Sequence, residues 1–99
     1  MFASVLVLDL HVPSASSLKD KRTAIAPILE GARRRQRVAA SEVGHQDLRQ
    51  RAELAFATVA SSESQAREVL DAVERFVWSF PEVEVLEARR GWLDQEDVR

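Results

Sequence analysis

Apolar residues in this sequence recur with two different periods, and the order of those periods restricts the fold. In residues 2–12 every second side chain is large and apolar after a serine, as in a β-strand with one face in a core. Residues 17–37 and 62–80 instead carry apolar side chains three and four positions apart, as in amphipathic helices. Shorter strand-like runs occupy residues 38–43, 53–60 and 83–86.

These segments follow one another as strand, helix, strand, strand, helix, strand. The order predicts an α+β, ferredoxin-like fold, in which a four-stranded antiparallel sheet carries both helices on one face. Right-handed crossovers would place the first and third strands in the centre of the sheet. A chain of 99 residues is long enough for a single domain. We expect that domain to span residues 1–90 and a polar C-terminal tail to follow at residues 91–99.

Pro27 conflicts with the first helix. Leu18, Ile25 and Ile28 keep helical spacing on both sides of it. An interior proline nevertheless costs a helix about 3 kcal/mol and clashes with the preceding turn. We therefore expect a kink at Pro27, or a break into two shorter helices.

The composition excludes several classes of site. The chain has no cysteine, so disulfides, thiolate metal sites and cysteine nucleophiles are excluded. Its apolar N-terminal run is too short to span a bilayer, is interrupted by Asp9 and His11, and lacks the basic leader of a signal peptide. We expect a cytoplasmic protein that does not enter a membrane.

A polar segment, residues 42–52, separates the second and third strands and predicts a surface hairpin loop. It gathers a histidine, carboxylates and arginines within a few positions, so specific binding is expected there. The alternative is that these groups only hold the loop in one shape. In that role Glu42 would form hydrogen bonds, and Gly44 would adopt a backbone conformation that a Cβ forbids.

Charge is distributed unevenly along the chain. Residues 17–51 carry nine basic side chains and four carboxylates, whereas residues 52–99 carry five arginines and eleven carboxylates. Basic residues at the start of a helix oppose its dipole, so a phosphate or a partner's carboxylate would supply the missing counterion. A basic half suits RNA, and the plainer alternative is a solvated face. The residues predicted to bind RNA or another partner are Lys19, Lys21, Arg22, Arg34, Arg35, His45, Gln46, Asp47, Arg49 and Arg51.

Catalysis has little support in the sequence. His45 beside Asp47 or Glu42 has the composition of an acid–base pair. A catalytic zinc site needs three protein ligands, and the only other histidine is His11, which is distant in sequence. We therefore expect a non-enzymatic protein with no catalytic residue, metal or cofactor.

The face of the sheet that the helices leave open carries small apolar residues. An uncovered apolar surface of this kind is typical of an interface, which predicts a homodimer. The alternative is that the tail folds across this face and the protein stays monomeric. The residues predicted for the dimer interface are Val5, Val7, Ala57 and Trp92.

Two stretches resemble the YlxP-like family of small bacterial proteins, also described as domain of unknown function 503. They are Ser17-Leu18-Lys19-Asp20-Lys21-Arg22 and Val43-Gly44-His45-Gln46-Asp47-Leu48, the second followed by Gln50-Arg51-Ala52. Arg49 stands where that family usually has tryptophan. The resemblance implies a ferredoxin-like fold and, because members are encoded beside genes for translation and ribosome maturation, a link to RNA or a ribosomal particle. The sequence thus favours a binding domain for RNA or the ribosome; a protein–protein adaptor or dimerisation module is the alternative.

Overall fold

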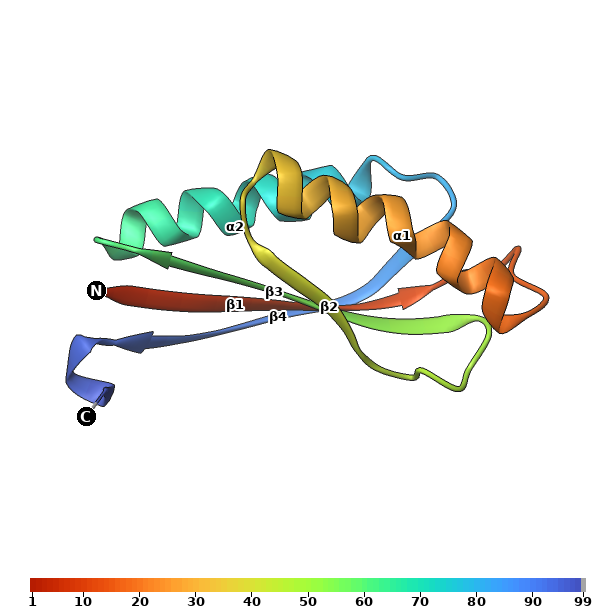
Figure 1. Cartoon of the computed structure of the whole chain (residues 1–99), viewed down its shortest axis with the longest axis horizontal. Coiled ribbons are helices and arrows are strands. Elements are labelled where there is room, and N and C mark those ends of the chain that lie inside the picture. The colour runs from red at the N-terminus through yellow and green to blue at the C-terminus, as the bar shows by residue number, and fades with distance from the viewer. Residues whose placement is uncertain (99) are drawn as a thin grey trace.

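The computed structural model describes residues 1–98, and its elements follow the predicted order (Figure 1). The sheet has the order β2-β3-β1-β4, and every neighbouring pair is antiparallel. The ferredoxin-like fold with its two central strands is therefore confirmed. The elements are β1 (Phe2–His11), α1 (Leu18–Arg35), β2 (Ala39–Gly44), β3 (Arg51–Ala60), α2 (Glu63–Trp78), β4 (Glu84–Asp94) and the short 3-10 helix η1 (Gln95–Asp97).

The core lies between the sheet and the two helices. Alternate residues from Leu6 in β1 to Val12, directly after the strand, are fully buried, as the period of two predicted. Phe56 is the largest apolar residue in this layer and comes from β3. The helices complete the core with the buried side chains Ile25, Ile28, Leu70, Val73 and Val77.

α1 is a single helix through Pro27, so the predicted break into two helices is wrong. Pro27 lies on the exposed side of α1, while Ile25 and Ile28 on either side of it are buried in the core. The helix is also capped, because the Ser17 side chain accepts a hydrogen bond from the Asp20 amide at 3.1 Å. Burial and capping together offset the cost of the missing Pro27 N–H.

β4 continues beyond the predicted domain boundary at residue 90. Residues 91–94 pair with the first residues of β1, Gly91 opposite Val5 and Asp94 opposite Phe2, so the predicted tail is wrong for this stretch. The reason is that β1 begins at Phe2. The backbone N–H and C=O groups on this edge of β1 find hydrogen-bond partners because β4 continues to Asp94. The last residue of the predicted tail, Arg99, lies outside the described residues.

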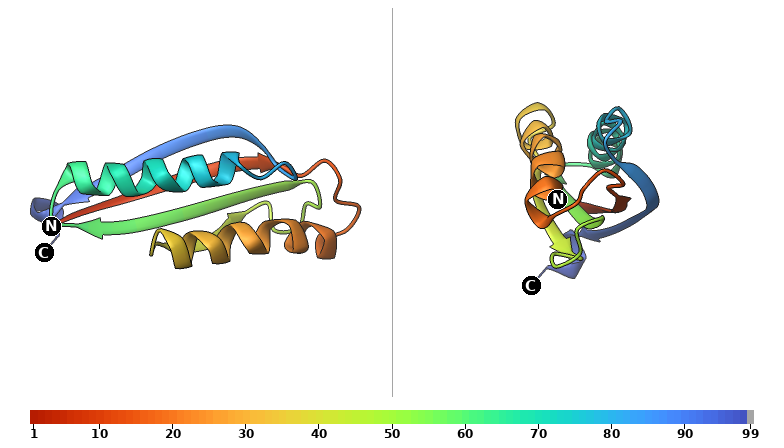
Figure 2. Two further views of the ribbon diagram at one scale, coloured as in Figure 1. Left: turned by 90° about the horizontal axis from the view of Figure 1, so that it is seen from above. Right: turned by 90° about the vertical axis from the view of Figure 1, so that its right-hand side faces the viewer.

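The two helices do not cover the whole sheet. α2 packs on β1 and β3, and α1 packs beside β2, whereas β4 runs along the outer side of α2 (Figure 2). The molecule measures 45 × 24 × 20 Å, with a radius of gyration of 13.9 Å against about 12.6 Å for a compact domain of this length. Its accessible surface of 6185 Å² similarly exceeds the roughly 5,700 Å² typical of this mass. The excess surface reflects an elongated sheet with an exposed outer strand.

Gly31 is required where α1 meets α2. A Cβ on Gly31 would lie 2.9 Å from Cε2 of Phe76. The Phe76 ring is held edge-to-face by Phe80, with centroids 5.0 Å apart, and by Arg35, whose guanidinium lies 5.2 Å from the centroid. We predict that Gly31→Ala lowers the free energy of unfolding by about 1–2 kcal/mol, because overpacking outweighs the gain in helix propensity.

Urea denaturation measures this effect, and Gly91→Ala is the matched control. A Cβ at Gly91 meets no atom within 4 Å, so that variant should keep the stability of the parent protein. Equal denaturation midpoints for the two variants would contradict the assigned contact.

Candidate functional site

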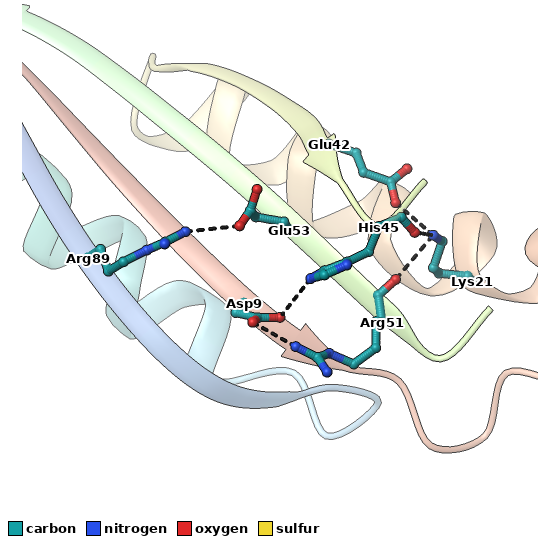
Figure 3. Close-up of polar contacts among 7 residues, drawn as sticks. All are labelled: Asp9, Lys21, Glu42, His45, Arg51, Glu53 and Arg89. Atoms are coloured by element: carbon teal, nitrogen blue, oxygen red, sulfur yellow. Dashed lines mark hydrogen bonds and ion pairs between the residues drawn. The ribbon is translucent and has the colours of Figure 1, made fainter. Parts of the chain in front are cut away.

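The β2–β3 hairpin loop, the start of α1 and the end of β1 meet at one end of the sheet (Figure 1). The ammonium group of Lys21 is buried there, with only 1% of the residue exposed. Its Nζ lies 2.8 Å from Glu42 Oε2 and donates to the carbonyl oxygens of His45 at 2.8 Å and Arg51 at 3.1 Å (Figure 3). It also donates to the carbonyl oxygen of Gln46 at 3.4 Å. One side chain of α1 therefore holds both ends of the loop.

The prediction that Lys21 contacts RNA or another partner is wrong, because its ammonium is enclosed within the protein. Lys21 precedes Ile25 by four residues and Ile28 by seven, so it lies on the inner face of α1. That spacing is the signal in the sequence that identifies Lys21 as an interior residue. Its two basic neighbours, Lys19 and Arg22, are exposed.

A buried ammonium is stable only when its lost hydration is replaced. Here one carboxylate and three backbone carbonyls replace it. Charge-assisted hydrogen bonds of this kind are about twice as strong as neutral ones. The carbonyls gain a donor in exchange, so a loop without regular secondary structure is held at defined points. The hairpin is thus a preorganised feature of the fold.

The backbone at the hairpin differs from the prediction for Gly44. No glycine among residues 1–98 has a positive φ; His45 instead takes the left-handed conformation, with φ of 57°. The reason for glycine at position 44 is close approach, since a Cβ there would lie 2.5 Å from Glu53 Oε1 and 3.2 Å from Glu53 Cβ. Gly44 follows a register shift in the β2–β3 ladder, where the strands need this room.

Gln50 ties the hairpin loop to the connection between β1 and α1. Its Nε2 donates to the carbonyls of Pro13 and Ala15, both at 3.2 Å. Its own carbonyl accepts from the Val12 amide at 2.9 Å. Gln50 belongs to the motif in the sequence but was not among the predicted site residues, because its partners come from a distant segment.

A second polar cluster lies on the open face of the sheet. Arg51 Nη2 donates to Asp9 Oδ2 at 2.7 Å, and His45 Nε2 lies 3.7 Å from Asp9 Oδ1, beyond hydrogen-bond range (Figure 3). Glu53, opposite Asp9 in the ladder, pairs with Arg89 at 2.9 Å. Asp9 was not among the predicted site residues. The signal in the sequence is its place two positions after Val7, which puts its carboxylate on the open face of β1. His45 and Arg51 therefore face away from α1.

The remaining predicted cations lie on the outer surface of α1 and the hairpin. In the part of the chain that the structure describes, no carboxylate lies within 4 Å of their charged groups; Arg33 instead donates to the Ala40 carbonyl, and Arg35 covers Phe76. Gln46 and Asp47 are exposed beside them, at the hairpin tip. We call these cations, together with the exposed Arg33 and Arg37 at the end of α1, the basic surface: Lys19, Arg22, Arg33, Arg34, Arg35, Arg37 and Arg49.

A shallow groove separates the hairpin from the start of α1. It has a volume of about 580 Å³ and is lined by residues 16–18 and 47–51. At its α1 end, the Ser16 hydroxyl and then the Ser16 amide donate to Asp20 Oδ2 at 2.6 Å and 3.0 Å. These bonds lower the pKa of the Asp20 carboxyl below its ordinary value of 3.8. The start of α1, held by these hydrogen bonds, thus forms one side of the groove, and Arg49 lines the other side.

The predicted dimer residues do not share one face. Val5, Val7 and Ala57 lie on the open face, with Val5 opposite Ala57 in the ladder. Trp92 lies opposite Ser4, which is buried on the helix side, so Trp92 also points to the helix side. The prediction that these four residues form one interface is therefore wrong for Trp92, because its face is set by a strand that was predicted as tail.

Residues 1–98 contain no cluster of three or more histidine or acidic side chains arranged to hold a metal ion. Across the same residues, neither helix is long and apolar enough to cross a membrane.

Comparison with known proteins places this fold and hairpin in a family. The family model described as "Protein of unknown function (DUF503)" matches residues 3–90. The chain belongs to the DUF503 family. It is 40% identical over 79 residues to "Uncharacterized protein YlxP" of Bacillus subtilis (strain 168), an alignment that covers 80% of this chain and 86% of that protein. The family resemblance read from the two sequence motifs is confirmed.

A solved structure supports the architecture of this DUF503 member. A de novo designed protein with a ferredoxin fold superimposes with a TM-score of 0.53, covering 100% of this chain and 88% of its own. The two sequences are only 13% identical, so this likeness concerns the fold alone.

Replacing Lys21 tests its role in holding the hairpin. Lys21→Met leaves the Glu42 carboxylate without its cation and the carbonyls of the loop without their donor, and we predict a loss of about 3 kcal/mol in the free energy of unfolding. Lys19→Met, two residues away and exposed, should change it by less than about 0.5 kcal/mol. Urea denaturation measures both, and equal stability of the two variants would refute the role of the buried ammonium.

The Ser16–Asp20 contact predicts a pH dependence at the start of α1. The folded pKa of Asp20 is lower than the unfolded value, so the contact is fully stabilising above pH 3.8 and is lost as pH falls through the folded pKa. Ser16→Ala should raise the pKa of Asp20 toward its ordinary value, whereas Ser14→Ala should not. NMR titration of the carboxyl carbon measures this, and identical curves for parent and Ser16→Ala would contradict it.

Proposed function

We propose that this chain is a non-catalytic, cytoplasmic binding domain whose basic surface contacts RNA of the translation apparatus. The observation that supports this proposal is the pairing of charges. Lys21, Arg51 and Arg89 are each neutralised by a carboxylate within the fold. Among residues 1–98, the cations of the basic surface are not, and the carboxylates near these seven cations that also lack an ion pair are Asp20, Glu30, Asp47 and Glu68.

The dimensions of the basic surface favour a polyanion over a single phosphate. α1 has 18 residues and is therefore about 27 Å long. The field of one charge is screened over about 8 Å at physiological salt. A single phosphate would reach only the cations at one end, whereas a nucleic acid backbone reaches several in succession. Neutralising each of them releases counterions, which is the main source of affinity for nucleic acids.

The hairpin adds a defined shape to this surface. Lys21 and Gln50 hold the loop against the start of α1, and Arg49 projects from it beside the groove. The exposed tryptophans, Trp78 and Trp92, come from α2 and β4, away from this surface. RNA would therefore be recognised through its phosphates and shape, without bases stacking on aromatic side chains.

The polar cluster on the open face favours a structural role over catalysis. Arg51 occupies one oxygen of Asp9, and His45 lies too far from the other oxygen to be oriented by it. No serine or threonine forms a hydrogen bond with His45 within the described chain. This supports the non-catalytic part of the proposal.

Charge reversal on the basic surface tests the RNA proposal. Arg22→Glu with Arg49→Glu should weaken binding of a labelled ribosomal RNA fragment by at least about tenfold at 50 mM salt, because two phosphate contacts become repulsive. The control is Arg67→Glu with Arg75→Glu on α2, which changes the net charge equally and should have little effect. Gel shift or fluorescence anisotropy measures the affinities.

Salt dependence provides a second reading from the same titrations. For a single strand, log affinity should fall by about 0.7 per unit of log salt for each phosphate neutralised. The slope should decrease in the Arg22→Glu, Arg49→Glu variant only. Absence of binding by the parent protein at 50 mM salt, or equal losses in the two double variants, would reject the proposal.

A further inference from the structure

β4 is unusually open for a strand of a folded domain. Every residue from Leu86 to Asp94 is exposed, and α2 reaches the strand mainly through the side chain of Arg90 while it packs on β1 and β3 (Figure 2). One edge of β4 pairs with β1, and in the sheet order the other edge has no neighbour. Its two faces and its outer edge are thus all accessible.

The stretch Ala88–Asp94 is a regular template for another strand. It pairs with β1 without a shift in register, and the single irregularity of the β1–β4 ladder lies before it, near Leu86. An outer strand presents a row of N–H and C=O groups that point away from the sheet. Proteins usually protect such an edge with a proline, a bulge or a short length, and Ala88–Asp94 has none of these.

Side chains on β4 offer contacts to the residues of an added strand. Trp92 is 67% exposed on the helix side, where it lines a shallow groove with Phe2, Ser4 and the start of α2. Leu93 is 52% exposed on the opposite face. An incoming strand would place alternate side chains beside Trp92 and beside Leu93, which is how added strands gain specificity.

The charges around this edge are acidic. The two arginines of β4 are bound within the fold: Arg89 pairs with Glu53, and Arg90 pairs with Asp71 at 2.8 Å and Glu74 at 2.9 Å. The carboxylates flanking the edge have no cationic partner within 4 Å among residues 1–98. They are Glu87, Asp94, Glu96 and Asp97.

We propose that the outer edge of β4 binds an extended, basic peptide segment of another protein by β-strand addition. The unpaired carboxylates attract lysine and arginine, and the backbone of Ala88–Asp94 supplies the hydrogen bonds. A second copy of this chain is a poorer occupant, because pairing two β4 edges would bring the same uncompensated carboxylates together. This surface lies on the far side of α2 from the basic surface, so it is separate from the proposed RNA contact.

Tryptophan fluorescence tests the peptide proposal without RNA. In a Trp78→Phe background Trp92 is the only tryptophan. A blocked eight-residue peptide of alternating lysine and threonine should change its emission on binding, and the same peptide with glutamate for lysine should bind at least about tenfold more weakly. The affinity should fall with salt. Equal binding of both peptides, or no binding of the lysine peptide, would overturn the proposal.

Charge variants locate the bound peptide on β4. Glu87→Lys with Asp94→Lys should reduce affinity for the lysine peptide by about tenfold or more. The matched control, Glu30→Lys with Glu68→Lys, changes the net charge equally on α1 and α2 and should reduce it far less. Equal losses in the two double variants would show that binding is not at this edge and would overturn the proposal.

Two proline variants test the backbone contact. Ala88→Pro and Gly91→Pro have opposite parity, so one removes an N–H that faces solvent and the other an N–H bonded to β1. The variant that keeps its circular dichroism spectrum should lose peptide binding. Normal peptide binding by this variant would refute the proposal. So would a sedimentation experiment in which the parent protein is a dimer and this variant is a monomer, because the edge would then bind a second copy of the chain. If both variants unfold, hydrogen exchange of the parent protein replaces this test. The bound peptide should then slow the exchange of the outward-facing β4 amides, and unchanged exchange rates would refute the proposal.

Discussion

The buried ammonium of Lys21 is the interaction on which the rest of the site depends. It comes from the first turns of α1, yet its acceptors belong to β2, to the hairpin loop and to the first residue of β3. Without it, the position of the loop against α1 would depend on side-by-side packing and on Gln50, which bonds only to the connection between β1 and α1. With it, the loop that carries Arg49 is fixed relative to the helix that carries Lys19 and Arg22. A residue inside the fold thus determines the shape of a surface outside it.

The pairing of charges also separates the molecule into two parts with different properties. Arginines of β3 and β4 form ion pairs with carboxylates of neighbouring elements, whereas most cations of α1 have no such partner among residues 1–98. The result is a basic surface on one side of the helical layer and an acidic outer strand beyond α2. Net charge alone, at −2, conceals this division. The two proposed partners, an RNA and a basic peptide, follow from the two signs and would bind without competing.

The sequence determined the architecture because hydrophobic period and order are local properties. The alternation in β1 and the stripe in α2 each identify their element and its inner face, and right-handed crossovers then leave one arrangement of strands. Prediction failed where a residue's environment depends on pairing between distant segments. The end of β4 was assigned to a tail because residues 91–99 are mainly polar, and only β1 gives residues 91–94 a partner. Trp92 was consequently assigned to the wrong face.

The candidate site shows the same limit. The hairpin motif was found from composition, but the role of Lys21 required knowing that its helix face meets three backbone carbonyls. NMR of the lysine side chains can distinguish a buried from an exposed ammonium here, because the chain contains only two lysines, Lys19 and Lys21. In ¹⁵N-labelled protein, Lys21 should give an ammonium signal that exchanges slowly with water and shows hydrogen-bond couplings to the carbonyls of His45 and Arg51, whereas the signal of Lys19 should exchange fast. Two ammonium groups that both exchange rapidly with solvent would contradict this role of Lys21.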